Sequence, residues 1–188
     1  MYQTEQNVSF LNGERANLRR LCKHDVGLAY LQWLNDPRVT KYLTVGKLPP
    51  SLGDLYHYVS TFEQNPKATA FAVIARDGGR FIGTVTLNNI DWFSRHADLG
   101  MMIGDAEARE EGYEKDALEL IAEFAFNRLH LRRLYHGVFE SQKERTEALE
   151  VLGWKREGAW EKHTLIGEEY EDEIWYGLVK DQPIPPSP

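Results

Sequence analysis

The chain has 188 residues, with 22 Lys and Arg against 29 Asp and Glu, a formal net charge of −7 and 42% hydrophobic residues. This length and composition are typical of one globular domain and exclude a disordered or fibrous chain. The acidic balance disfavours nucleic acids and anionic membranes as partners, because both are bound mainly through Lys and Arg.

The first half of the chain is predicted to contain a hairpin and three helices. These elements are strands 8–11 and 16–19 and helices 25–34, 39–43 and 51–64. A turn at Asn12-Gly13 joins the two strands. Apolar residues at helical spacing indicate the first helix, with Asp25 as its N-cap, and Ser51 is suited to cap the third.

The second half is predicted to be strand-rich around one long helix. Its elements are strands 70–75, 81–88 and 97–103, helix 112–129, strand 134–139, helix 145–152, and strands 160–166 and 171–179. Asp77-Gly78-Gly79 indicates a hairpin, and Gly153 is a good helix C-cap. A strand, a long helix and a further strand form a crossover unit, so strands 97–103 and 134–139 are expected to be parallel neighbours.

The numbers and positions of cysteine and histidine residues indicate the cellular compartment and whether a metal site is expected. Cys22 is the only cysteine, so no internal disulfide forms, which favours a reducing cytoplasm. No stretch approaches the roughly 20 apolar residues of a membrane helix, and the 6 histidines are dispersed. We expect a cytoplasmic protein with no metal site, no membrane association and no nucleic-acid partner.

Five short sequence motifs resemble those of the GNAT N-acyltransferase superfamily and its RimJ/RimL-like branch. They occur in the order of that family, and the resemblance covers residues 8–180. They are WLNDPRVTKYL at 33–43, IGTVTLNNID at 82–91, ADLGMMIGD at 97–105, LGWKREG at 152–158 and YEDEI at 170–174. The resemblance implies an α/β (α+β) fold: one GNAT-like domain, 1–180, with a mixed, mostly antiparallel sheet splayed into a V and flanked by helices. The segment 181–188 is expected to be an extended Pro-rich tail.

The resemblance also implies an activity. Family members transfer an acyl group from acyl-CoA to the amine of a small molecule, an amino sugar or a protein N-terminus, and dimers are common among them. Acetyl-CoA is expected in the V, along strand 97–103, with its pyrophosphate on backbone N–H groups where the long helix begins. The residues implied in cofactor binding are Met101, Met102, Ile103, Arg109, Gly112, Tyr113 and Glu114.

The phosphate loop departs from the family pattern, Arg/Gln-x-x-Gly-x-Gly/Ala. Arg109 and Gly112 fit it, but Glu114 stands at the last small position and Glu110 where many members have another glycine. A glutamate there adds a Cβ and a negative charge where a phosphate oxygen should approach, although acids also suit a first helical turn. A tyrosine that many members use as a general acid is replaced by Leu149.

Two functional interpretations follow from this departure. One is an N-acetyltransferase acting on a small-molecule amine or amino sugar. The other is a GNAT fold that no longer binds acetyl-CoA and serves as a ligand-binding or regulatory module, or has changed chemistry. Residues 105–116 contain six acids and two bases, which favours the second, but the N-acyltransferase is the family default and is the function expected here.

Acyl transfer to an amine requires a base that removes a proton from the ammonium. The candidate bases are Asp98, His96 and His136, each of which is alternatively an ordinary polar or hydrogen-bonded residue. Side chains in the segments that wall the acceptor pocket of the family are Trp33, Tyr42, Asn88, Asp91 and Trp92. Aromatic residues there can stack on an acceptor, or they can belong to the core, which is the alternative for Trp33.

Overall fold

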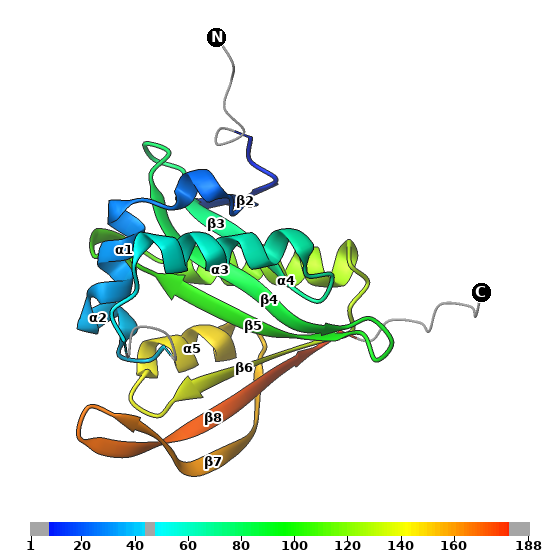
Figure 1. Cartoon of the computed structure of the whole chain (residues 1–188). Coiled ribbons are helices and arrows are strands. Elements are labelled where there is room, and N and C mark those ends of the chain that lie inside the picture. Colours follow the sequence, from blue (N-terminus) through cyan, green and yellow to red (C-terminus); the bar gives the residue numbers. More distant parts are fainter. Residues whose placement is uncertain (1–7, 44–47, 181–188) are drawn as a thin grey trace.

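One eight-stranded sheet, in the order β1-β2-β3-β4-β5-β6-β8-β7, organises the protein (Figure 1). The structure is a computed structural model that describes residues 8–43 and 48–180. The strands are β1 (Leu11–Asn12), β2 (Ala16–Arg20), β3 (Thr69–Ala75), β4 (Phe81–Asp91), β5 (His96–Ile103), β6 (Arg133–Phe139), β7 (Lys155–Ile166) and β8 (Glu169–Val179). The helices are α1 (Leu28–Asn35), α2 (Pro37–Thr40), α3 (Leu52–Gln64), α4 (Tyr113–Asn127) and α5 (Lys143–Val151), with 3₁₀ turns η2 (Lys23–Asp25) and η3 (Glu107–Glu110).

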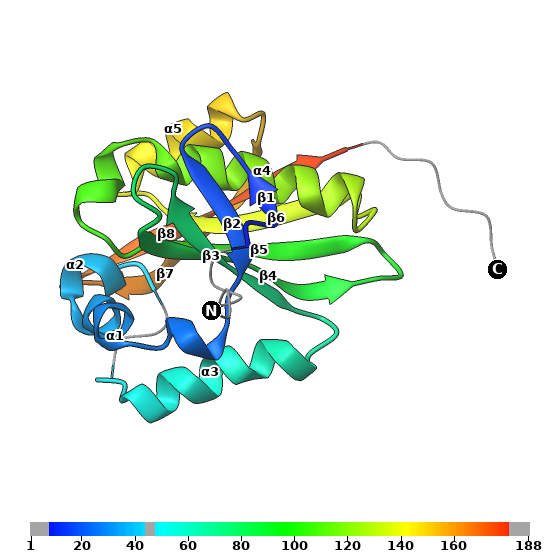
Figure 2. The same cartoon turned by 90° about the horizontal axis from the view of Figure 1, so that it is seen from above.

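The helices cover the two faces of the sheet unequally. Helices α4 and α5 lie on one face, here the α4 face, and α1, α2 and α3 lie on the other, here the α3 face (Figure 2). The larger core packs under α4 and contains Leu99 and Ile121, whereas the smaller core under α3 contains Leu55 and Met102. The sheet is therefore buried on both faces over its centre.

The sheet splits between β5 and β6, its one parallel pair. Their paired residues are His96 with Arg133, Ala97 with Leu134 and Asp98 with Tyr135. Beyond Asp98 the strands run on to Ile103 and Phe139 while they diverge (Figure 1). The predicted α/β fold, with a mostly antiparallel sheet splayed into a V, is confirmed, and so is the parallel crossover through α4.

Local sequence signals set several of the observed boundaries. Ser51 caps α3, since its hydroxyl accepts from the Asp54 N–H while the Asp54 carboxylate accepts from the Ser51 N–H. Gly153 ends α5 at a φ of 84°, in the left-handed region that glycine enters without strain. The turn at Gly78-Gly79 likewise uses two positive φ angles. These three predictions are confirmed.

The prediction for the first helix is wrong at its start. Helix α1 begins at Leu28 with Gly27 as its N-cap, not at Asp25. The Asp25 carboxylate is instead buried and accepts two bonds from the Arg19 guanidinium, at 2.6 and 2.8 Å, and one from the Cys22 N–H. An ion pair with β2 and a backbone bond within the η2 turn therefore take the oxygen atoms that the sequence pattern assigned to the cap of α1.

Other boundaries also differ from the prediction. The second helix spans Pro37–Thr40 rather than 39–43, because the Asp36 carboxylate caps it and Pro37 occupies the first turn. Strand β1 covers only Leu11–Asn12, whereas β7 starts at Lys155 and is much longer than the predicted strand 160–166. The remaining predicted elements differ by a few residues at their ends, and the tail at 181–188 lies outside the described residues.

The first turn of α4 is fastened to the β1–β2 turn by Asp116. Its carboxylate accepts the backbone N–H groups of Glu14, Arg15 and Ala16, at 3.3, 2.9 and 2.7 Å. A Cβ at Gly13 would collide with this carboxylate, so the turn can approach only because residue 13 is a glycine. Asp116 therefore fixes where α4 starts.

Replacing Asp116 by alanine is expected to lower the free energy of unfolding by about 1–3 kcal/mol, because three backbone donors lose a charged acceptor. Urea denaturation measures the change. Glu119→Ala, at an exposed position on the same helix, is the control for helix propensity. Equal effects of the two substitutions would contradict the fastening role.

Candidate active site

A cavity of about 380 Å³, the V cleft, opens where β5 and β6 diverge. It lies between α2, the end of β5 and the first turns of α4 and α5. Its lining residues are Arg38, Val39, Tyr42, Leu43, Met101, Met102, Ile103, Arg109, Glu114, Ser141, Gln142, Lys143, Glu144 and Arg145. The structure thus brings together Tyr42 and most of the residues predicted to bind the cofactor, with Gly112 and Tyr113 directly before Glu114.

The free edge of β5 presents backbone donors to the V cleft. The Met101 carbonyl accepts from Arg145 at 3.5 Å, and the Ile103 carbonyl accepts from Arg109 at 3.3 Å. Both arginines lie on the side away from β4. Because the N–H and C=O of one strand residue point to the same side, the N–H groups of Met101 and Ile103 also face the cleft. A strand edge of this kind can hold an extended ligand by backbone hydrogen bonds.

The loop before α4 is held in an open, glycine-dependent conformation. Gly112 is the N-cap at a φ of 78°, and no side chain caps the helix there. Arg109 ties the loop to the end of β5 through the Gly104 carbonyl, at 3.1 Å. Tyr113 donates to Asp77 at 2.5 Å, and this bond raises the pKa of Tyr113 to about 12. The first N–H groups of α4 are therefore presented on an anchored loop.

The acids around this loop are engaged by partners outside it. Glu114 forms an ion pair with Arg145 of α5, at 2.5 Å. Arg80 pairs with Asp105 and Glu107, at 3.3 and 2.7 Å. Together with Asp116, which accepts backbone N–H groups of the β1–β2 turn, four of the six acids at 105–116 have partners outside the loop. The V cleft itself is lined by four cationic side chains and two carboxylates, with Arg145 paired to Glu114 and Arg38 paired to Asp36 beside the cleft.

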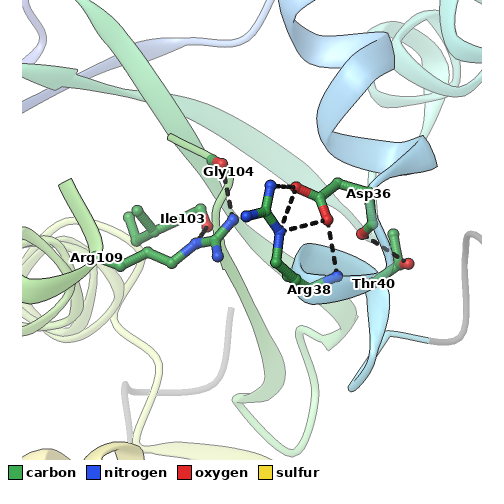
Figure 3. Close-up of polar contacts among 6 residues, drawn as sticks. All are labelled: Asp36, Arg38, Thr40, Ile103, Gly104 and Arg109. Atoms are coloured by element: carbon green, nitrogen blue, oxygen red, sulfur yellow. Dashed lines mark hydrogen bonds and ion pairs between the residues drawn. The ribbon is translucent and has the colours of Figure 1, made fainter. Parts of the chain in front are cut away.

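Two of these cations meet at the mouth of the cleft (Figure 3). Asp36 holds the Arg38 guanidinium through both carboxylate oxygens, at 2.8–3.2 Å, and hydrogen bonds from Arg38 lower the pKa of Asp36 to about 2. Figure 3 shows the guanidinium groups of Arg38 and Arg109 pointing toward one another. Converging guanidinium groups form a suitable site for phosphate oxygens.

On the α3 face a second cavity, the α3 pocket, also measures about 380 Å³. It shares Leu43, Met101 and Met102 with the V cleft. Its other lining residues are Tyr30, Leu34, Pro50, Asp54, Leu55, Tyr58, Thr84, Thr86, Asn88 and Gly100. Asn88, predicted to bind substrate, donates to Thr86 at 2.8 Å. The two cavities meet at Met101 and Met102, so ligands in them would approach each other there.

A third cavity of about 510 Å³, the tryptophan pocket, lies next to the point of divergence. Its lining residues are Asn89, His96, Asp98, Arg133, Tyr135, Trp160 and Trp175. It brings together two of the candidate bases, His96 and Asp98. Burial, and secondarily the charge of Glu173, raise the pKa of Asp98 to about 6.

His136, the third candidate base, lies apart from them in the core. Its Nδ1 is 2.6 Å from the Leu99 carbonyl, so the neutral Nδ1–H tautomer donates there. Burial, and then the charge of Arg145, lower the pKa of His136 to about 3. His136 is therefore neutral and hydrogen-bonded in the core, whereas Asp98 lines an open cavity.

The other predicted acceptor residues are used locally. Trp33 packs against Tyr30 and Phe81 and occupies the space that a side chain at Gly104 would need. Asp91 accepts the N–H groups of Phe93 and Ser94 in the β4–β5 turn, both at 2.8 Å. The indole of Trp92 donates to the Pro66 carbonyl at 2.9 Å. Their roles toward an acceptor stay predictions.

Several site residues escaped the sequence analysis. Four of them stand at no fixed spacing from the recognised motifs: Lys143, Arg145, Trp160 and Trp175. Arg38 was also missed, although it lies inside the motif at 33–43. Among residues 8–43 and 48–180, no three His, Cys, Asp or Glu side chains are grouped as metal ligands would be. Within the same ranges no helix is long and apolar enough to cross a membrane.

Comparisons with known proteins agree with the fold. Residues 15–155 match the family model described as an acetyltransferase (GNAT) domain. An uncharacterized N-acetyltransferase, p20 of Bacillus licheniformis, is 23% identical over 89% of this chain and 94% of its own length. Spermidine N-acetyltransferase of Vibrio cholerae, in complex with CoA and spermine, superposes with a TM-score of 0.79 at 20% identity, over 88% of this chain and 95% of that one. A GNAT-family acetyltransferase of Bacillus anthracis gives 0.75 at 21% identity, over 90% and 97%.

Proposed function

The chain belongs to the GNAT acetyltransferase family, and from this premise we propose that it transfers an acetyl group from acetyl-CoA to the primary amine of a small molecule. The observation that carries the proposal is the split between β5 and β6. At this split the N–H groups of Met101 and Ile103 face a cleft lined by four cationic side chains. Placement in the RimJ/RimL-like branch stays a prediction.

The residues of the V cleft fit a CoA ester. Arg38, Arg109 and Lys143 would bind its phosphate groups, together with the first N–H groups of α4. The edge of β5 would pair with its amide-containing arm. Acetyl-CoA supplies an activated thioester carbonyl. The fit also favours retained cofactor binding over a module that has lost it, because Arg145 offsets the charge of Glu114.

We assign the proton transfer to Asp98. It is the last residue of β5 that pairs with β6, and among the described residues no hydrogen bond or ion pair engages its carboxylate. At neutral pH a carboxyl group with a pKa of about 6 is ionised and accepts the proton of an acceptor ammonium. The Met101 N–H, directed into the split, would donate to the thioester oxygen as negative charge develops on it. His136 is a positioning residue, because it holds the Leu99 carbonyl.

The acceptor would approach from the α3 face. The α3 pocket meets the V cleft at Met101 and Met102, and Gly100 and Asp98 follow on the same face of β5. Tyr58 and Asn88 of this pocket would contact the body of the acceptor. The spermidine N-acetyltransferase of Vibrio cholerae, solved with spermine, agrees with a small-molecule amine as the acceptor class.

Isothermal titration calorimetry with acetyl-CoA and with CoA tests the proposal. We expect both to bind, and Arg38→Ala to weaken acetyl-CoA about tenfold by removing a charged hydrogen-bond donor. The control is Arg128→Ala, because Arg128 lies at the far end of α4, over the Phe10 ring. Absence of binding at millimolar acetyl-CoA would overturn the proposal and favour the module without acetyl-CoA.

A further inference from the structure

We propose that the tryptophan pocket is a cation subsite, which binds a second ammonium group of the acceptor beyond the amine that is acetylated. The inference rests on the proposed function for the identity of the acceptor. Binding of the cation itself is independent of acetyl-CoA and can be measured alone. The acceptor class is thereby narrowed to amines that carry a further positive charge.

Aromatic rings form the walls of this pocket. The Trp160 and Trp175 rings lie 4.9 Å apart between centroids, and Trp175 is 5.9 Å from Tyr135. Trp160 is 50% exposed although it is a large hydrophobic residue. The faces of Trp and Tyr rings attract ammonium groups, which is the usual reason for aromatic walls around an accessible pocket with a carboxylate.

Negative charge in and beside the pocket is only partly compensated by its neighbours, because the ion-pair partner of Glu173 is His163, at 3.9 Å, which is charged only when it is protonated. Asp98 has no partner among the described residues, and Glu173 lies over Gly137, where an added Cβ would come within 2.6 Å of its carboxylate. Burial raises the pKa of both carboxyl groups. The one arginine of the lining, Arg133, is neutralised by a bidentate pair with Glu157. A bound ammonium would supply the missing charge.

The backbone is distorted at several places around this pocket. Strands β7 and β8 shift register between Trp160 and Thr164, with Lys162 at a φ of 46°. Strands β4 and β5 shift between Asn88 and Asp91, with the lining residue Asn89 at a φ of 49°. Bulges and positive φ angles at residues other than glycine cost energy and concentrate where a side chain must be aimed at a ligand.

Two glycines beside the pocket, on the same face of the sheet, leave room for carboxylate side chains. Gly137 stands opposite Trp175, and Gly177 opposite Tyr135. A side chain at Gly177 would collide with Glu157, just as one at Gly137 would with Glu173. Both carboxylates can therefore lie against the sheet. Glu157 binds Arg133 there, and Glu173 lies beside the pocket. A diamine with one nitrogen at Asp98 would place the other toward Trp160 and Glu173.

The test is calorimetric titration of the full chain, without acetyl-CoA, with 1,4-diaminobutane and with the uncharged 1,4-butanediol. We expect only the diamine to bind. Trp160→Leu should weaken it about fivefold and Glu173→Gln about tenfold. The matched controls on the same hairpin are Tyr170→Leu, at a 63% exposed ring, and Glu169→Gln. Circular dichroism checks that each variant is folded.

The outcomes separate this inference from the proposed function. Equal binding of the diol, no binding of the diamine, or unchanged affinity in both pocket variants would overturn the cation subsite, even if acetyl-CoA binds and a monoamine is acetylated. Diamine binding that is weakened by both pocket variants and by neither control would support the subsite, even if acetyl-CoA does not bind and the proposed activity fails.

Discussion

Replacing Asp98 by asparagine is expected to lower kcat/KM for acetyl transfer by about 10²–10⁴-fold, the usual contribution of a positioned general base. The substitution keeps the shape of the side chain and removes its ability to accept a proton. Asp98 lies outside the V cleft, so the affinity for acetyl-CoA should not change. Steady-state kinetics and calorimetry on the same preparation separate the two effects.

The pH profile identifies the base. Asp98 acts only as the carboxylate, and its pKa is raised to about 6, so kcat/KM of the native protein should fall about tenfold per pH unit below that value. Asp98→Asn should lose this limb of the profile. His96 shares the pocket and serves as the comparison: if His96→Asn removes the limb and Asp98→Asn does not, the assignment to Asp98 is wrong.

The sign of the change in the free energy of unfolding shows whether Asp98→Asn loses activity because it misfolds. Because the pKa of Asp98 is raised from 3.8 to about 6, the folded state holds a proton that the unfolded state has released between these pH values. Stability therefore falls as pH rises through this window and stays lower above it. Asp98→Asn should abolish that loss and raise the free energy of unfolding at pH 7 by on the order of 1 kcal/mol. A misfolded variant would instead be less stable at every pH.

The sequence predicted the elements that local chemistry decides. Ser51, Gly153 and the Asp-Gly-Gly turn each act through backbone groups a few residues away, so their roles could be inferred without the fold. The split of the sheet followed from the strand, helix and strand order together with the family resemblance. Asp25 failed as a predicted cap because it forms a buried side-chain ion pair with Arg19 on β2, and residue spacing does not show that the two side chains are buried together.

The acidic loop shows why local charge alone misleads. Residues 105–116 have a clear excess of acids, but Arg80 and Arg145, far away in the sequence, pair with three of them. The tryptophan pocket was missed for a similar reason. Trp160 lies opposite Glu173, and Trp175 lies opposite Gly158, so the two tryptophans are diagonal neighbours on one face of the β7–β8 pair. The register that brings them together is set between two shifts, which leave no signal in residue spacing.

Replacing Arg145 by methionine is expected to weaken acetyl-CoA binding by about 100-fold, because one partner of a partly buried, hydrogen-bonded charge pair is removed. Arg145 is only 16% exposed in its side chain and Glu114 24%. Without the arginine, the Glu114 carboxylate would stand uncompensated beside the first N–H groups of α4, where a phosphate should bind. The effect would thus combine a lost cation with a newly freed anion.

A double-mutant cycle separates these two contributions. Glu114→Gln alone should strengthen acetyl-CoA binding severalfold, because it removes the repulsion and frees Arg145. The variant with both substitutions should recover most of the loss caused by Arg145→Met. Lys143→Met is the matched comparison, since Lys143 lines the same cleft on the same helix and its removal frees no carboxylate. If the double variant bound as weakly as Arg145→Met, Glu114 would not be the anion that Arg145 restrains, and the cleft would depend on the arginine alone.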